Sequence, residues 1–187
     1  MTPKEALNRL LEGNIRYAEC KQTQVCITQE LRTDLFVNGQ FPYAAIVGCS
    51  DSRVPAELIF DAGAGELFII RTAGNIIGPT QMGSLEYAVL NLKTPLVVVL
   101  GHQHCGAVKA ATTNGEFSPS LGAVIDEIRC CAPNVIGSNP EIIEDENIRY
   151  VLAKIAANPS ISKAVSEGSV HLAAAKYSLE TGIVSFF

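Results

Sequence analysis

Three residues of the kinds that bind metal ions lie in two short stretches of this sequence. Cys49 ends the apolar stretch YAAIVGC, and His102 and Cys105 follow the apolar stretch PLVVVLG in the order H-x-x-C. Two cysteines and one histidine form a ligand set that suits Zn²⁺, and three protein ligands leave a fourth position for water, as in catalytic zinc sites. The sequence therefore predicts one zinc ion per chain, in a site of the catalytic type.

A carboxylate and a guanidinium group follow the first cysteine, at Asp51 and Arg53. Two thiolates neutralise the charge of Zn²⁺, so a bound hydroxide and the Asp51 carboxylate would both add negative charge. Arg53 can offset that charge in a bidentate salt bridge with Asp51, which also holds the carboxylate in place as a hydrogen-bond acceptor. We expect this pair to orient a zinc-bound hydroxide toward a substrate.

The ligands need elements that bring distant residues together. Apolar runs at 43–48, 66–71 and 95–101 are typical of strands buried on both faces of a parallel sheet, and residues 82–92 between the last two show helical spacing. This order predicts an α/β fold with a mostly parallel sheet flanked by helices. Cys49 and His102 would then lie at the carboxyl ends of two strands, where open α/β sheets bind ligands.

The remaining segments frame this core. Thr2 and Glu5 form a capping-box pattern that starts a helix, with apolar residues at Ala6, Leu7, Leu10 and Leu11. The pattern after residue 106 is mostly helical, and its acidic run 144–147 is most simply a solvated helix start. Two strand-like runs on either side of LETG follow at the end of the sequence. We expect one domain over 1–187, with an N-terminal helical arm at 1–40 and an α/β core with C-terminal strands at 41–187.

Composition excludes several classes of protein. With 48% hydrophobic and 18% charged residues and a net charge of −5, the chain is globular and lacks the basic character that nucleic-acid binding needs. No stretch approaches the roughly eighteen apolar residues of a membrane span, and the first residues, MTPKEALNRLLEGN, lack the features of a secretory signal. We expect a cytoplasmic protein with reduced thiols that binds neither nucleic acid nor membrane.

The sequence resembles the β-class carbonic anhydrases. CSDSRVP, RTAGN, GSLEYAV and GHQHCGAV match motifs of that family in order and spacing, and EGNIRY and AKYSLETGIVSFF extend the resemblance over nearly the whole chain. It implies zinc on Cys49, His102 and Cys105, with Asp51 and Arg53 as the catalytic dyad. The implied reaction is the reversible hydration of CO₂ to bicarbonate and a proton by zinc-bound hydroxide.

The resemblance also implies a substrate pocket and a partner. Gln40, Phe68 and Tyr87 match the pocket glutamine, phenylalanine and tyrosine of plant-type members, and the backbone amide of Gly106 would face the substrate. On periodicity alone the two aromatic residues would simply belong to the core. In this family the N-terminal helix packs on a partner subunit in an obligate dimer, so we expect a homodimer or a larger assembly of dimers.

Two other functions and one structural question stay open at this point. Hydrolysis of carbon disulfide or carbonyl sulfide at a related zinc site would need the same hydroxide, although the match at Gln40, Phe68 and Tyr87 favours CO₂. A non-catalytic zinc-binding interaction module would lack the Asp51–Arg53 pair, which is present. The residues leave open whether Asp51 pairs with Arg53 or closes the fourth position of the zinc ion.

Overall fold

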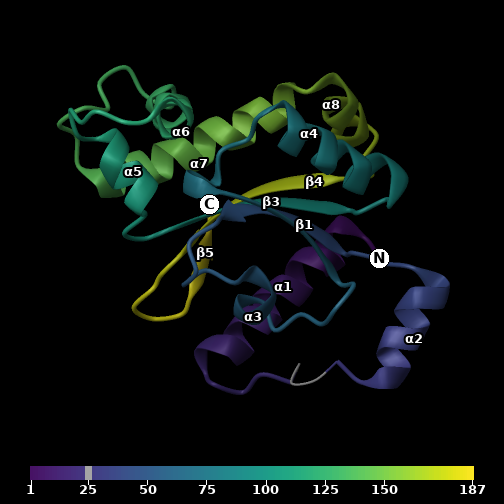
Figure 1. Ribbon diagram of the computed structural model, residues 1–187. Coiled ribbons are helices and arrows are strands. Elements are labelled where there is room, and N and C mark those ends of the chain that lie inside the picture. Colours follow the sequence, from purple (N-terminus) through teal and green to yellow (C-terminus); the bar gives the residue numbers. More distant parts are fainter. Residues whose placement is uncertain (24–26) are drawn as a thin grey trace.

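A single twisted sheet organises the chain, of which the computed structural model describes residues 1–23 and 27–187. Within these residues five strands pair in the order β2-β1-β3-β4-β5 (Figure 1). The first four run parallel and the last is antiparallel to its neighbour: β1 (Ala44–Cys49), β2 (Leu67–Thr72), β3 (Leu96–His102), β4 (His171–Tyr177) and β5 (Val184–Phe186). The predicted mostly parallel α/β fold is confirmed.

Helices cover both faces of the sheet (Figure 1). One face carries α1 (Pro3–Ala18) and the short α3 (Ala56–Ile59). The other side carries α4 (Pro79–Glu86), α5 (Gly106–Ala111), α6 (Pro119–Arg129), α7 (Pro140–Ala157) and α8 (Pro159–Ser166). The remaining helix, α2 (Gln29–Asn38), lies apart from the sheet and buries none of its residues. Among the described residues no helix combines the length and apolar character that a membrane crossing requires.

The two central strands explain the continuous apolar runs of the sequence. Every residue of β1 and of β3 is buried, because helices cover both faces of the sheet at its centre. Cys49 and His102 are the last residues of these strands and still pair across the sheet, with Thr72 and Tyr177. The chain leaves β1 toward β2 on one side and later returns to β3 on the other, so the site lies where the strand order switches direction.

The segment predicted to be a helix over 82–92 is divided. It begins as α4 and continues as a π-helical turn, η2 (Tyr87–Asn91). Lys93 then adopts a φ of 57°, in the left-handed region, which ends the helix before β3 begins.

Helix α1 packs on the sheet of its own chain. Its predicted capping box is present, because Thr2 Oγ1 accepts the N–H of Glu5 and the Glu5 carboxylate accepts the N–H of Thr2. Ala6 and Leu10 are fully buried in the same core cluster as Ile46 of β1. The apolar stripe of α1 is therefore partly covered within the chain, while Leu11 and Ile15 stay exposed.

Asn14 connects α1 to α3, to the turn before β5 and to β5 itself. The side chain is buried, and Nδ2 donates to the carbonyl oxygens of Ile59 and Gly182 at 3.2 and 2.9 Å. Its Oδ1 accepts the N–H of Val184 at 2.8 Å. One amide thus joins the amino-terminal helix to the last strand.

We expect Asn14→Ala to lower the free energy of unfolding by about 3 kcal/mol, because it leaves buried backbone groups without partners at about 1–3 kcal/mol each. Urea denaturation of the purified chain measures this change. The matched control is Asn8→Ala, an exposed asparagine on the same helix, which should change stability by no more than about 0.5 kcal/mol. Equal effects of the two substitutions would contradict the role given to Asn14.

Candidate metal centre

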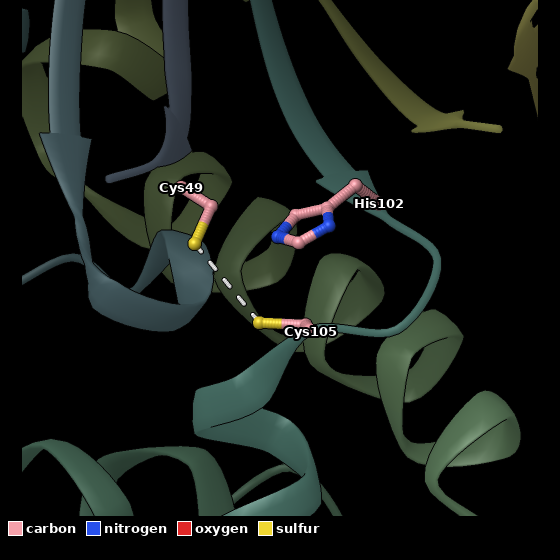
Figure 2. A group of neighbouring side chains, drawn as sticks. All are labelled: Cys49, His102 and Cys105. Carbon is pink, nitrogen blue, oxygen red and sulfur yellow. Dashed lines mark hydrogen bonds between the residues drawn. The ribbon is translucent and has the colours of Figure 1, made fainter. Parts of the chain in front are cut away.

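Three donor atoms converge beyond the ends of β1 and β3. The Sγ atoms of Cys49 and Cys105 lie 4.0 Å apart, and the ligand atoms of Cys49, His102 and Cys105 all lie within 4.8 Å of one another (Figure 2). Two sulfur atoms bound tetrahedrally to one zinc ion at about 2.3 Å would be about 3.8 Å apart. All three residues are buried, so the predicted ligand set forms a compact group of a size that fits a metal ion.

The imidazole of His102 is oriented as a ligand. Its Nδ1 lies 2.8 Å from the carbonyl oxygen of Gln103, which can only accept, so Nδ1 carries the proton. The lone pair of Nε2 is therefore free to bind a metal ion. Nε2 is buried and has no hydrogen-bond partner among the described residues. A carbonyl behind the ring is a common partner of metal-binding histidines, because it fixes the tautomer.

The side chains of Cys49 and Cys105 share one proton when no metal ion is bound. The neighbouring Cys105 thiol, the nearby His102 imidazole and the backbone N–H groups of Asp51 and Gly74 lower the pKa of Cys49 to about 4 despite burial. The Cys49 thiolate and burial raise the pKa of Cys105 in turn. Without metal the pair therefore consists of a thiolate and a thiol, and a metal ion that binds both sulfur atoms displaces the remaining proton.

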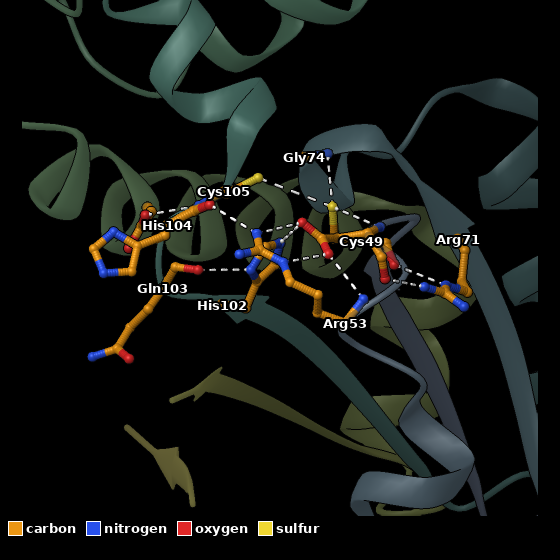
Figure 3. Close-up of polar contacts among 10 residues, drawn as sticks. Cys49, Arg53, Arg71, Gly74, His102, Gln103, His104 and Cys105 are labelled. Atoms are coloured by element: carbon orange, nitrogen blue, oxygen red, sulfur yellow. Dashed lines mark hydrogen bonds and ion pairs between the residues drawn. The ribbon is translucent and has the colours of Figure 1, made fainter. Parts of the chain in front are cut away.

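Asp51 is held by Arg53 beside the donor atoms. Arg53 donates from Nε to Oδ1 at 2.9 Å and from Nη2 to Oδ2 at 2.7 Å, and its backbone N–H also bonds Oδ1. These bonds hold the pKa of the Asp51 carboxyl well below its usual range. The same Nη2 donates to the carbonyl oxygen of His104 at 3.2 Å, so Arg53 connects the two ligand-bearing loops (Figure 3). The structure thus has Asp51 paired with Arg53.

Sequence reasoning missed Arg71, which supports the first loop from β2. Its guanidinium donates to the carbonyl oxygens of Cys49 and Asp51 (Figure 3). The residue belongs to the RTAGN stretch, whose motif match was the available signal. In the same stretch Gly74 has a φ of 68° and donates its N–H to the Cys49 sulfur at 3.3 Å. A Cβ on Gly74 would lie 2.6 Å from Ile128 Cδ1, so only glycine fits this position.

The expectation of a solvated helix start at 144–147 is wrong, because α7 begins at Pro140 and two of the four residues are buried. Glu144 is 5% exposed and its Oε1 accepts the N–H of Cys105 at 3.2 Å. Asn147 is fully buried and its Nδ2 donates to the carbonyl oxygen of Gly74 at 2.8 Å. The sequence signal for their burial is the helical spacing that places them beside Ile143 and Ile148, on the buried face of the same helix.

Within one chain, the residues predicted to form the pocket do not gather at the metal donors. Phe68 pairs with Ala45, four residues before the end of β2 at Thr72. At about 3.3 Å per residue it is therefore about 13 Å from the metal end of the sheet. Tyr87 packs against Phe68, with ring centroids 6.3 Å apart, and Gln40 is exposed in the segment before β1. Gly106 alone adjoins the site, as the exposed first residue of α5.

Comparison with known proteins places this geometry in a family. The family model described as carbonic anhydrase matches residues 44–184. Carbonic anhydrase 2 of Mycobacterium tuberculosis is 39% identical over 189 residues, which cover 96% of this chain and 90% of the relative. The carbonic anhydrase of Mycolicibacterium smegmatis is 36% identical over 192 residues, covering 97% and 92%.

Solved structures agree in fold. A tetrameric β-carbonic anhydrase of Sordaria macrospora superposes with a TM-score of 0.76 at 24% identity, over 98% of this chain and 97% of that one. The β-carbonic anhydrase CcaA superposes with a TM-score of 0.75 at 28% identity, over 97% and 94%. Since the family model spans most of the chain and the mycobacterial relatives match nearly its whole length, the chain belongs to the β-class carbonic anhydrases.

Proposed function

We propose that the chain catalyses the reversible hydration of CO₂ to bicarbonate and a proton, with one zinc ion per chain held by Cys49, His102 and Cys105. The observation that carries the proposal is the unpartnered Nε2 of His102, buried within reach of two sulfur atoms at tetrahedral spacing. Family membership supports the reaction. Both thiols must stay reduced to bind the metal, which supports a cytoplasmic location.

The residues around the donor atoms have separate roles in this proposal. When bound, zinc supplies an activated water as the nucleophile. Asp51, which Arg53 holds as a hydrogen-bond acceptor, would accept a hydrogen bond from such a water and so orient it toward the carbon of CO₂. Gly106 opens α5 beside Cys105, and the first N–H groups of a helix have no partner within it. Its amide is therefore available to an oxygen of the substrate.

The two alternative functions are separated by different observations. The dyad is assembled, with a bidentate bond between Arg53 and Asp51, and a non-catalytic zinc module would have no need of it. Carbon disulfide and carbonyl sulfide call for the same nucleophile, so only assays with each gas beside CO₂ distinguish them. We expect CO₂ to be the preferred substrate.

We also propose a homodimer in which each copy completes the pocket of the other. Phe68 and Tyr87 contact each other but lie far from the metal donors of their own chain, and Tyr87 is 48% exposed. Large apolar side chains of the arm are also exposed, among them Ile15, Phe36 and Phe41. A second copy that covers these residues can bring its Phe68 and Tyr87 to the metal centre. The tetrameric relative from Sordaria macrospora supports assemblies of this kind.

The first prediction from the proposed function concerns the metal. We expect the purified chain to contain one zinc ion and Cys105→Ser to lose zinc and CO₂ hydration, because a serine hydroxyl does not replace a thiolate ligand. Elemental analysis and a stopped-flow assay measure both properties. Cys131→Ser is the control, since this partly buried thiol lies outside the group of donors. Full zinc occupancy and normal turnover in Cys105→Ser would refute the ligand assignment.

The second prediction concerns the dyad. Asp51→Asn should retain zinc and lower kcat/KM for CO₂ about 10–100-fold, because the amide has neither the charge nor the two acceptor oxygens that Arg53 engages. Asp126→Asn removes an exposed carboxylate of α6 and should leave the rate unchanged. If kcat/KM of Asp51→Asn equals that of the unmodified chain, Asp51 has no role in the reaction.

The third prediction uses hybrid dimers. Cys105→Ser lacks a metal site and Tyr87→Ala lacks a pocket residue, so each variant alone should have little activity. When the two are unfolded, mixed in equal amounts and refolded, half of the dimers are hybrids that each contain one intact site, and about a quarter of full activity should return. No recovery on mixing would show that the pocket is not shared between chains.

A further inference from the structure

One face of helix α7 holds both loops that carry the cysteine ligands. Glu144 accepts the N–H of Cys105 at 3.2 Å. Asn147, three residues later on the same face, donates to the carbonyl oxygen of Gly74 at 2.8 Å, and Gly74 donates to the Cys49 sulfur at 3.3 Å. We propose that this face is a positioning scaffold that sets the two sulfur atoms at metal-binding distance. The proposal rests on the zinc site described under the proposed function.

The Glu144 contact secures a turn that needs support. His104, just before Cys105, is a non-glycine residue with a φ of 54°, in the left-handed region that costs energy unless the surroundings hold it. The N–H of Cys105 is buried, and such a group destabilises the fold if it lacks an acceptor. Glu144 supplies that acceptor, while Arg53 donates to the carbonyl oxygen of His104 in the same turn.

Glu144 is itself fixed in place. Its Oε2 lies 2.9 Å from Nζ of Lys176 on β4, and the two side chains are 4% and 14% exposed. Lys176 pairs across the sheet with Gly101, the residue before His102, and also binds Asp145. The buried carboxylate is thus neutralised by a cation from the sheet, as a buried charge requires. A chain of contacts runs from the sheet through the helix to the cysteine loop.

The Asn147 contact fixes the other sulfur. Gly74 lies in the left-handed region and directs its N–H at Cys49, so a shift of this residue would remove a hydrogen bond from the thiolate. Asn147 binds the carbonyl oxygen of the same residue from a fully buried position. The amide therefore restrains the loop that stabilises the first ligand.

Close packing also brings the helix against the strand that ends in His102. Ile148, the residue after Asn147, is fully buried against the end of β3. A Cβ on Gly101 would lie only 2.4 Å from Ile148 Cδ1, so the absence of a side chain at Gly101 lets α7 approach the strand that ends in His102. The helix thus contacts the supports of all three ligands.

Substitutions on α7 distinguish positioning from general stability. Glu144→Met keeps the volume but removes the acceptor, and Asn147→Leu removes the donor at similar size. Glu144→Gln keeps an acceptor oxygen and serves as the rescue, whereas Glu146→Gln changes an exposed neighbour paired with Arg149 and serves as the control. Zinc affinity of the purified full chain is measured by competition with a chromophoric chelator, and Co²⁺ replaces zinc for absorption spectra of the thiolate–metal bands.

We expect Glu144→Met and Asn147→Leu to weaken zinc binding about 10–100-fold and to change the intensity of the cobalt–thiolate absorption. Glu144→Gln should recover most of the affinity, and Glu146→Gln should match the unmodified chain. Unchanged zinc affinity and cobalt spectra in the Met and Leu variants, with lower thermal stability alone, would overturn the proposal. A Glu144→Gln variant as weak as Glu144→Met would overturn the role of its hydrogen bond.

The outcomes separate this inference from the proposed reaction. If Glu144→Met does not fold, Asn147→Leu decides the matter, and wild-type zinc affinity in that variant overturns the scaffold. An unmodified chain that binds zinc but does not hydrate CO₂ contradicts the proposed function, while the affinity comparison still tests the scaffold. An unmodified chain that binds no zinc contradicts both.

Discussion

Two buried cysteine sulfur atoms held 4.0 Å apart are the constraint on which the rest of the structure depends. Two thiolates at this distance repel each other, and without a metal ion the pair keeps a proton between them. The surrounding protein also holds the two sulfur atoms in position. It does so with backbone N–H groups directed at Cys49 and with the turn that carries Cys105.

The parallel sheet provides the first level of this control. β1 and β3 are neighbours that run in the same direction, so residues fifty positions apart in the sequence end at one edge. Helix α7 provides the second level, because it contacts the loops of both sulfur atoms and packs against Gly101 near the end of β3. The charged groups provide the third, since Arg53 joins the two loops and at the same time keeps Asp51 ionised. In the proposed function, metal binding and substrate orientation thus depend on the same few contacts.

Much of this could be predicted from the sequence, and the parts that could not have physical reasons. The apolar runs around Ile46 and Val98 predicted buried parallel strands because helices cover both faces of the central sheet. The helical spacing of Glu144 and Asn147 with Ile143 and Ile148 indicates burial, but their hydrogen-bond partners lie on loops about forty and seventy residues away, which no local pattern reveals. The position of Phe68 could have been anticipated, because it lies near the start of a strand whose parallel neighbour ends in Cys49. The stripe of α1 showed that Ala6 would be buried but not which surface would cover it.

The coordination of the bound metal tests the central claim most directly. X-ray absorption spectroscopy of the purified chain at its zinc edge reports the kinds and distances of the atoms around the ion. We expect two sulfur atoms at about 2.3 Å and one imidazole nitrogen at about 2.0–2.1 Å, with one further oxygen atom completing four ligands. A shell with four protein sulfur or imidazole ligands, which leaves no place for water, or a shell without sulfur, would contradict the assignment of Cys49, His102 and Cys105 as an open catalytic zinc site.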